Sequence, residues 1–301
     1  MNKIQGWINL YKPKNISSFN SINKIKKKFS IDKIGHAGTL DPLAEGILPV
    51  AIGKTTKLIP FVNQNIKKYN FTINWGKQTT TDDSEGSIIN KSELIPDLEN
   101  IIFKSKNFTG HIMQKPPKVS AVKVNGERAY KLVRKNIEFD IKLKKVYVKS
   151  IKILKHNIPQ TSFEIESGKG FYIRSFARDL SKELGTYGHI SALERLKVGK
   201  FTKKSSILLD DLLKIGQRLT EINCIKPSIS MLDDILAVEV EDQKDLINIS
   251  LGRSIEIDEN KLLSFSSDLL DNNLIFLSSN GDIVSIGKLV GNLFKPKKVL
   301  L

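Results

Sequence analysis

The chain has 301 residues, of which 40% are hydrophobic and 27% charged, and its formal net charge at pH 7 is +16. This composition excludes a disordered or fibrous polypeptide and predicts a globular protein with a sizeable core. Cys224 is the only cysteine, which excludes an intramolecular disulfide, and apolar runs such as residues 47–52 are far too short to span a membrane. With no apolar signal segment at the N-terminus, we expect a cytoplasmic protein.

The positive charge is concentrated in the first three quarters of the chain. Residues 231–301 hold 7 basic and 12 acidic side chains, so their net charge is −5 and that of residues 1–230 is +21. Lysine and arginine release condensed counterions when they neutralise phosphates, so this distribution favours a polyanion as partner. A lysine-rich composition inherited from an AT-rich genome explains the charge equally well.

Three elements are predicted in the first quarter of the chain. A helix is expected over residues 18–29, after a serine N-cap, because four apolar residues recur at helical spacing: Phe19, Ile22, Ile25 and Phe29. Residues 35–46 contain three glycines and a proline and are expected to form a loop. Alternating apolar and polar residues then predict a half-buried strand over residues 69–75.

The middle of the chain predicts two more strands and one helix. The strands are expected at residues 146–154 and 162–166. An apolar stripe predicts a helix over residues 173–184, which Gly185 would end as a C′ glycine. Strands and helices do not alternate regularly, so the pattern favours an α+β fold with a mixed, largely antiparallel central sheet.

The character of the chain changes near residue 230. An acidic stretch over residues 232–248 is expected to be helical, and turn sequences follow at Asp271–Asn273 and at Asn280-Gly281. Short strands are expected at residues 283–289 and 293–301. The chain therefore predicts two domains, residues 1–235 and a small β-rich domain of residues 236–301.

The loop over residues 35–46 holds the most suggestive polar residues. His36, Thr39, Asp41 and Glu45 lie within ten positions, immediately before a buried apolar run. Polar groups gathered beside such a run often line a site on a rigid scaffold. An aspartate in a glycine-rich loop is, however, more often a turn former or a helix cap.

Four extended segments, in order along the chain, resemble the motifs of the bacterial tRNA pseudouridine-55 synthases, the TruB family. They are GHAGTLDPLAEGILPVAIGKTTKL from residue 35, KKYNFTINWGKQTTTDDSEG from residue 67, QKPPKVSAVKVNGERAYKLVR from residue 114 and GKGFYIRSFARDLSKELGTYGHISALERLKVGKF from residue 168. The ending FKPKKVL resembles the last strand of a PUA-type RNA-binding domain. The resemblance implies a pseudouridine synthase fold followed by a PUA-like domain, and four colinear motifs are a strong signal.

The implied activity is isomerisation of uridine 55 in the T-arm loop of tRNA to pseudouridine. The reaction needs neither redox change nor added group, so no cofactor is expected, and the four scattered histidines show no metal-ligand spacing. In the family, the aspartate that matches Asp41 is the nucleophile. Arg174 matches the arginine that is its partner, and an arginine can both lower the pKa of a carboxylate and hold it through a fixed set of donors.

The resemblance also implies roles for further residues, each with a plainer alternative. Tyr69 would be the third catalytic residue, packing on the target uracil and assisting proton transfer; a core tyrosine is the alternative. Substrate-binding roles are expected for five residues: His36, Asp83, Tyr172, Lys115 and Lys123. Asp83 could instead form a turn, Tyr172 could be a core residue, and each lysine is at least as well explained as a solvated surface residue.

Three positions depart from the family pattern, and two other functions fit the same motifs. Glu194 stands where an arginine is usual, Phe171 replaces a threonine, and Trp75 replaces a leucine. The alternatives are a non-catalytic tRNA-binding or folding chaperone and a guide-RNA-dependent pseudouridine synthase. A compact chain favours a stand-alone enzyme, expected to be a monomer without an obligatory protein partner.

Overall fold

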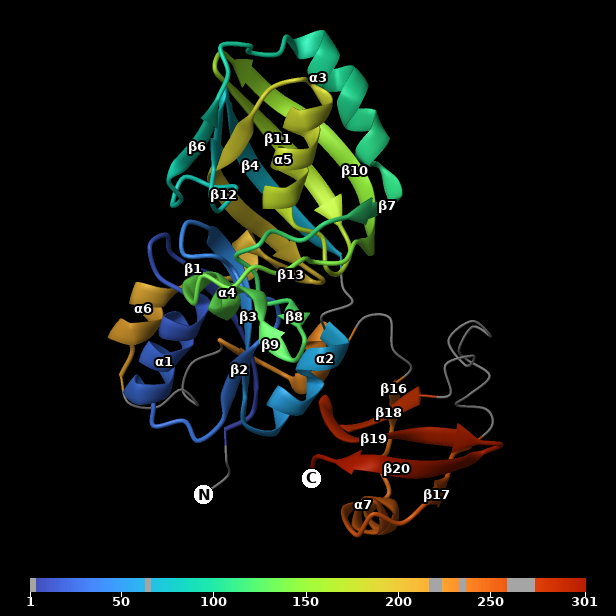
Figure 1. Ribbon diagram of the computed structural model, residues 1–301. Coiled ribbons are helices and arrows are strands. Elements are labelled where there is room, and N and C mark those ends of the chain that lie inside the picture. The colour runs from blue at the N-terminus through green and yellow to red at the C-terminus, as the bar shows by residue number, and fades with distance from the viewer. Residues whose placement is uncertain (1–3, 63–65, 217–223, 233–236, 259–273) are drawn as a thin grey trace.

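A large mixed sheet and a smaller C-terminal sheet organise the molecule, shown as a computed structural model in Figure 1. The structure describes residues 4–62, 66–216, 224–232, 237–258 and 274–301. The described helices are α1 (Ser18–Lys28), α2 (Ile59–Val62), α3 (Leu98–Ser105), α4 (Ala129–Arg134), α5 (Ile173–Glu183), α6 (Leu209–Lys214) and α7 (Gln243–Ser250). Within these ranges, no helix is both long and apolar enough to cross a membrane.

The large sheet has eleven described strands, and its path runs in the order β14-β1-β3-β12-β4-β11-β10-β7. Its strands are β1 (Gly6–Lys12), β2 (Ile34–His36), β3 (Glu45–Ile52), β4 (Lys67–Trp75), β7 (Gly110–Gln114), β10 (Lys144–Asn157), β11 (Gln160–Ser167), β12 (Gly188–Val198), β13 (Phe201–Thr202), β14 (Ile207–Leu208) and β15 (Ile225–Lys226). Among these described strands of the large sheet, only β1 with β14 and β3 with β12 pair in parallel. The prediction of a mixed, largely antiparallel sheet is therefore confirmed.

Two small hairpins lie outside this sheet. One joins β5 (Lys77–Thr79) to β6 (Ile88–Lys91), and the other joins β8 (Lys123–Val124) to β9 (Glu127–Arg128). Strands β5, β8 and β9 lie in segments that resemble the family motifs, and the segment that leads into β8 and β9 contacts the first turn of α5.

Strand β4 is central to the sheet and alternates strictly between buried and half-buried residues, as its sequence predicts. Its buried face packs against helix α5 through Phe176, which is fully buried and meets Phe71 of β4 edge-on at 5.7 Å and Phe163 of β11 at 5.8 Å. Burial of one such ring contributes about 1.5–3 kcal/mol. These contacts fix the first turn of α5, and hence Arg174, over the middle of the sheet (Figure 1).

Both long predicted helices are present. Helix α5 ends before Gly185, which has the left-handed backbone (φ +71°) expected of a C′ glycine. Helix α1 begins at the predicted serine cap, where the Ser17 side chain accepts a hydrogen bond from the Asn20 backbone at 3.1 Å. One detail is wrong: Phe19 is 64% exposed, because the buried face of α1 is formed by Ile22 and Ile25.

The C-terminal sheet has the order β16-β18-β19-β20-β17. Its strands are β16 (Ala237–Glu239), β17 (Ile255–Glu256), β18 (Leu274–Ser279), β19 (Asp282–Val290) and β20 (Leu293–Val299). Strands β19 and β20 confirm the two strands predicted there. The acidic helix predicted over residues 232–248 is largely wrong: 237–239 is a strand, helix α7 begins only at Gln243, and 233–236 lie outside the described residues. The turn predicted at residues 271–273 also lies outside them, and the domain boundary at 235 stays a prediction.

The two sheets share an apolar contact. Phe276 of β18 is fully buried and meets Phe61 of α2 edge-on at 4.9 Å, within a cluster that also contains Trp7 of β1. The Trp7 indole donates a hydrogen bond to the carbonyl of Ser228 at 2.9 Å. The Ser228 hydroxyl in turn accepts a hydrogen bond from the Ile283 backbone N–H of β19 at 2.6 Å, so apolar contacts and the segment around Ser228 hold the C-terminal sheet against the large one.

Candidate active site

The loop between β2 and β3 places Asp41, and two contacts fix it. The Ser18 hydroxyl at the start of α1 both accepts from the Leu40 backbone N–H and donates to the Leu40 carbonyl, each at 2.8 Å. On the other side, the Asn15 backbone N–H donates to the carbonyl of Pro42 at 2.8 Å. Leu40 is itself buried in the core, so the aspartate projects from an anchored loop.

The Asp41 carboxylate meets the guanidinium of Arg174. Arg174 Nε lies 2.9 Å from Asp41 Oδ2 and 3.6 Å from Asp83 Oδ2. The two terminal nitrogens donate to the backbone carbonyls of Thr81 and Val119, both at 3.0 Å. One buried arginine therefore connects the Asp41 loop, the segment around Asp83 and the segment before β8, which lie far apart in the sequence.

The charge state of Asp41 reflects two opposing effects. Burial raises the pKa of Asp41, and the neighbouring Arg174 guanidinium opposes this by favouring the carboxylate. The Asp41 side chain nevertheless keeps 35% of its surface exposed, whereas that of Arg174 keeps 7%. The carboxylate is thus partly stripped of water, held by a cation, and open on one side to a ligand.

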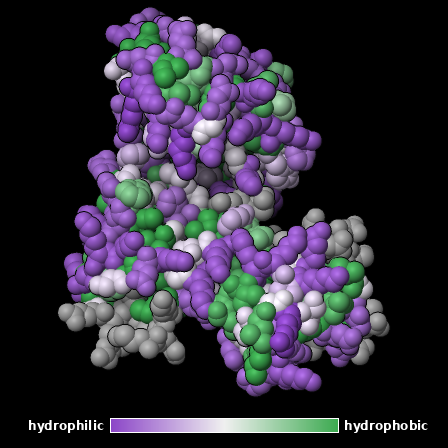
Figure 2. Space-filling view, turned by 60° about the horizontal axis from the view of Figure 1, so that its bottom comes forward, coloured by the Kyte–Doolittle hydropathy of each residue, from purple (hydrophilic) through white to green (hydrophobic). Residues whose placement is uncertain are grey.

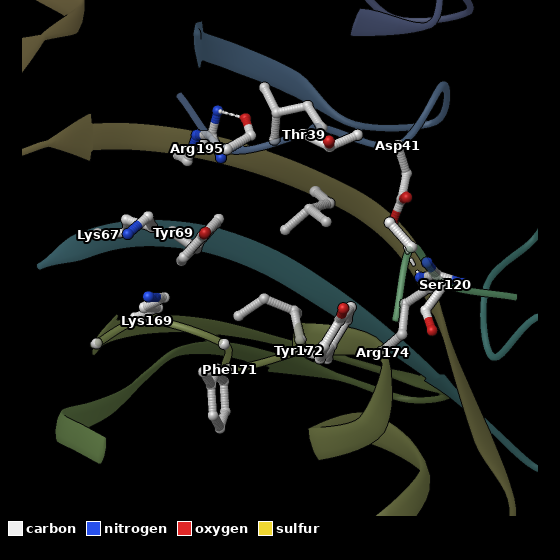
Figure 3. A pocket seen from close by; sticks show the side chains of 17 residues that line it. Thr39, Asp41, Lys67, Tyr69, Ser120, Lys169, Phe171, Tyr172, Arg174 and Arg195 are labelled. Carbon is white, nitrogen blue, oxygen red and sulfur yellow. Dashed lines mark hydrogen bonds and ion pairs between the residues drawn. The ribbon is translucent and has the colours of Figure 1, made fainter. Parts of the chain in front are cut away.

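That open side faces a cavity of about 310 Å³. Figure 3 shows Asp41, Arg174 and Ser120 at one end, Tyr172 between the two ends, and Tyr69 beside Lys67 toward the other end. Tyr172 immediately precedes α5, and its backbone N–H donates to Gln114 Oε1 at 2.8 Å. Burial raises the pKa of Tyr172, so its phenol stays protonated at neutral pH. The cavity therefore offers a carboxylate and two aromatic rings to one ligand.

Tyr69 and Arg195 form the floor of the cavity. They face each other across β4 and β12, and the Tyr69 phenol interacts with the Arg195 guanidinium. Arg195 is 1% exposed and donates to the carbonyls of Ile47 at 2.7 Å and Gly38 at 2.9 Å. It thus supports both Tyr69 and the start of the loop that carries Asp41.

Arg195 and two buried lysines, Lys12 and Lys67, were not predicted from the sequence. The pKa of each lysine is lowered to about 8, mainly by burial, and in the case of Lys67 also by the nearby cations Arg195 and Lys169. Lys12 donates to the carbonyls of Pro13 at 2.9 Å and Ile16 at 2.7 Å. A basic residue in step with the apolar positions of a strand, as Lys67 is with Tyr69, is the signal that could have identified such residues.

Two of the predicted substrate-binding residues lie near the cavity but do not line it. Asp83 is 2% exposed behind Arg174, and its Oδ1 accepts hydrogen bonds from the Thr81 hydroxyl at 2.5 Å and the Glu85 backbone at 3.1 Å. His36 is half-buried at the end of β2, where burial lowers its pKa to about 4, so its ring is neutral at pH 7. Asp83 therefore faces Arg174 and its own loop.

The two predicted substrate-binding lysines are exposed and outside the cavity. Lys115 pairs with Asp140 at 2.5 Å, and Lys123 lies on the short strand β8. Glu194, which replaces the usual arginine, also lies outside the cavity. Its Oε1 accepts hydrogen bonds from the Tyr11 phenol and the Lys203 ammonium, both at 2.8 Å. Glu194 thus links β1 to the segment that follows β13.

Comparison with known proteins identifies the family. The sequence profile described as TruB family pseudouridylate synthase (N terminal domain) matches residues 26–173. The chain is 36% identical over 298 residues to tRNA pseudouridine synthase B of Caulobacter vibrioides, covering 98% of this chain and 96% of that protein. It is 41% identical over 253 residues to the enzyme of the same name from Caulobacter sp. strain K31, covering 84% of this chain and 81% of the relative.

A solved structure confirms the predicted fold. The chain in the crystal structure of a Cbf5-Nop10-Gar1 complex matches with a TM-score of 0.71 and 24% identity, over 98% of this chain and 85% of that one. The match extends through the C-terminal sheet, as expected for a pseudouridine synthase fold followed by a PUA-like domain. With a TruB profile over its N-terminal half and TruB relatives along nearly its whole length, the chain belongs to the TruB family of pseudouridylate synthases.

Proposed function

We propose that this protein converts uridine 55 in the T-arm loop of tRNA to pseudouridine, with Asp41 as its nucleophile. The observation that carries the proposal is the ion pair of Asp41 and Arg174, at 2.9 Å, at the open end of a cavity lined by Tyr69 and Tyr172. Relatives named tRNA pseudouridine synthase B support tRNA as the substrate.

The chemistry assigned to Asp41 follows from the reaction. The N1–C1′ glycosidic bond breaks, the uracil turns, and C5 bonds to C1′, with N1 gaining a proton and C5 losing one. The Asp41 carboxylate bonds to the ribose or to the base, holds that fragment while the other turns, and is released again by the time the C5–C1′ product forms. Arg174 is a positioning residue that keeps Asp41 ionised and aimed at the cavity.

The remaining residues are assigned by whether they line the cavity or lie beside it. Tyr69 packs on the uracil at the cavity floor and assists proton transfer, and Tyr172 lines the cavity wall. Asp83 acts through Arg174, since it contacts the guanidinium and its own loop. His36 orders the RNA beside the cavity, where its neutral ring can donate and accept one hydrogen bond each.

The target base must leave its stack to reach Asp41. Extrusion of a base costs a few kcal/mol, which contacts to the rest of the RNA must offset. Lys115 and Lys123 are exposed on the segment that also reaches Arg174 through the carbonyl of Val119, so we assign them to RNA phosphates near the cavity mouth.

We infer that the protein acts as a monomer, without guide RNA or partner protein, in the cytoplasm. The likeness to a chain from the Cbf5-Nop10-Gar1 complex concerns the fold alone. The relatives of 36–41% identity carry the name of a tRNA enzyme and match this chain over most of their own length. A chaperone on the same scaffold would not need a carboxylate in contact with Arg174 beside two tyrosines.

The test is to incubate the purified chain with unmodified tRNA, without guide RNA or other protein, and to map pseudouridine by mass spectrometry after a derivatisation that labels pseudouridine and not its isomer uridine. We expect stoichiometric pseudouridine at position 55. Folded protein that binds the tRNA and forms none would contradict the proposal and favour the chaperone. Pseudouridine formed only after a guide RNA is added would favour the guide-dependent alternative.

A further inference from the structure

The cavity has a second end, opposite to Asp41, that is lined by basic side chains. Figure 3 shows Lys67, Lys169 and Arg195 gathered there, away from Asp41 and Arg174. They come from three separate segments: the first residue of β4, the turn that follows β11, and β12. Among the described residues that line the cavity, Asp41 is the only carboxylate.

A comparison of the adjacent residues Lys67 and Lys68 shows that the strand itself places Lys67 in the cavity. Strand alternation sends them to opposite faces of the sheet. Lys68 faces outward and pairs with Glu164 at 2.8 Å. Lys67 faces the cavity with only 7% of its surface exposed, on the same side as Tyr69 and Arg195.

Holding these cations together is costly. Arg195, at 1% exposure, donates to two backbone carbonyls and contacts the Tyr69 phenol. Burial, and after it the like charges of Arg195 and Lys169, lower the pKa of Lys67 to about 8. Like charges gathered in a cavity at such a cost are typical of a binding site for an anion.

The exposed Lys169 indicates what kind of anion fits. It lies in the turn Gly168–Gly170, at the rim of the cavity, while Lys67 and Arg195 lie deeper. A ligand that contacts all three extends from the floor of the cavity to solvent. A phosphodiester within a polynucleotide does this, since its chain must leave the cavity after the extruded nucleotide.

We propose that Lys67, Lys169 and Arg195 form a subsite for one of the two backbone phosphates that flank the extruded uridine. The inference rests on the proposed function, because it places the uracil and ribose between Asp41 and Tyr69. The phosphate would fix the nucleotide at one end while Asp41 acts at the other. It would also compensate the repulsion among the three cations, a cost already present in the free protein.

The experiment combines a change in the RNA with a change in the protein. T-arm stem-loop RNAs carry a neutral methylphosphonate in place of each flanking phosphate in turn. Wild type, Lys67→Gln and Lys169→Gln are compared with Lys68→Gln, the matched control on the opposite face. For each pair, kcat/KM for pseudouridine formation and the Kd for the RNA are measured, and thermal unfolding checks that each variant is folded.

We expect wild type to lose about tenfold in kcat/KM with one of the two modified RNAs, the effect of removing one charged hydrogen bond. Lys67→Gln should lose about tenfold with native RNA and almost nothing further with that same modified RNA. Lys169 is exposed, so its substitution should not disturb folding. Lys169→Gln should lose less than about tenfold in kcat/KM with native RNA, and again almost nothing further with that modified RNA. Lys68→Gln should behave as wild type with all three RNAs.

If the losses in kcat/KM from the protein change and from the RNA change multiply, the two act independently and the proposed phosphate subsite is contradicted. No loss with either modified RNA would contradict it as well. Failure of the proposed function gives a different result, namely no pseudouridine from wild type and native RNA. The Kd values for the same pairs would still test the phosphate contact in that case, since they do not depend on turnover.

Discussion

At the scale of single residues, the site depends on how one guanidinium is used. The nitrogens of Arg174 divide their contacts, because Nε faces two carboxylates while the terminal nitrogens hold two backbone carbonyls. A lysine has one charged centre and no planar fork, so it cannot replace these contacts. The position of Asp41 therefore depends on the shape of its partner as well as on its charge.

We predict that Arg174→Lys lowers kcat at least about 100-fold, with KM changed less than about threefold, because Asp41 is misplaced after the RNA is bound. Steady-state kinetics on tRNA provide the measurement. Arg178→Lys is the control: it lies one turn further along α5, outside the cavity, and pairs with Asp82 at 3.2 Å. Arg174→Lys with near wild-type kcat would contradict the role given to the guanidinium.

The pKa of Lys67 predicts a pH dependence of stability. Its pKa is about 8 in the folded protein and 10.5 as the ordinary value, so between these pH values the unfolded chain binds more protons. The free energy of unfolding that Lys67 contributes therefore rises with pH over that window. We expect wild type to gain about 1–3 kcal/mol relative to Lys67→Met between pH 7.5 and 10.

Urea unfolding of both proteins across this pH range measures the difference. Lys68→Met is the control, since Glu164 raises the pKa of Lys68 and its contribution should stay constant up to pH 10. A constant difference between wild type and Lys67→Met would show that the buried lysine has an ordinary pKa.

Some site residues could be predicted from the sequence and others could not, because motif, burial and charge differ in what they reveal. Asp41 and Arg174 were paired through the family motifs alone, because no pattern in one chain brings positions 41 and 174 together. Arg195 was missed because its importance lies in burial and in hydrogen bonds to backbone carbonyls of β3 and of the loop before it. Lys115 and Lys123 were selected for their charge, which does not tell a cavity wall from an exposed surface.

At the scale of elements, the strict alternation in β4 and the apolar stripe of α5 predicted both correctly, because each packs one face on the core. The failures share a cause. Phe19 fits the helical spacing but is exposed on α1, and residues 237–239 form a strand through parallel pairing with β18. Tertiary contacts determine both the exposure of Phe19 and the strand over residues 237–239, and local periodicity does not reveal tertiary contacts.

Gly46 lies where the Asp41 loop joins β3, and a substitution there tests how closely β3 and β12 must approach each other. Its φ is +111°, and a Cβ there would lie 2.2 Å from the carbonyl oxygen of Arg195 on the paired strand β12. We predict that Gly46→Ala lowers the free energy of unfolding by more than about 3 kcal/mol, through backbone strain and this clash.

Chemical denaturation measures this, with Gly126→Ala as control. Gly126 also has a positive φ, +86°, but a Cβ there meets nothing within 4 Å, so only the backbone cost of about 1–2 kcal/mol is expected. Equal losses in the two variants would mean that β3 can shift away from β12.

At the scale of the whole molecule, charge and a hydrophilic surface both favour a large polyanionic substrate. Residues 1–230 carry a net charge of +21, and hydrophilic side chains dominate the face shown in Figure 2. If about four or more phosphates are contacted, the Kd for tRNA should rise about 100-fold or more between 50 and 200 mM salt. Fluorescence anisotropy with labelled tRNA measures this, and a Kd independent of salt would contradict it.

The most direct test of the account is the rate of pseudouridine formation by Asp41→Asn under single-turnover conditions, measured together with its Kd for tRNA. The substitution keeps the size of the side chain and removes its charge and nucleophilicity. We predict a rate at least about 1000-fold below wild type, with tRNA affinity changed less than about fivefold. Turnover near the wild-type rate would contradict the assignment of Asp41 as the nucleophile.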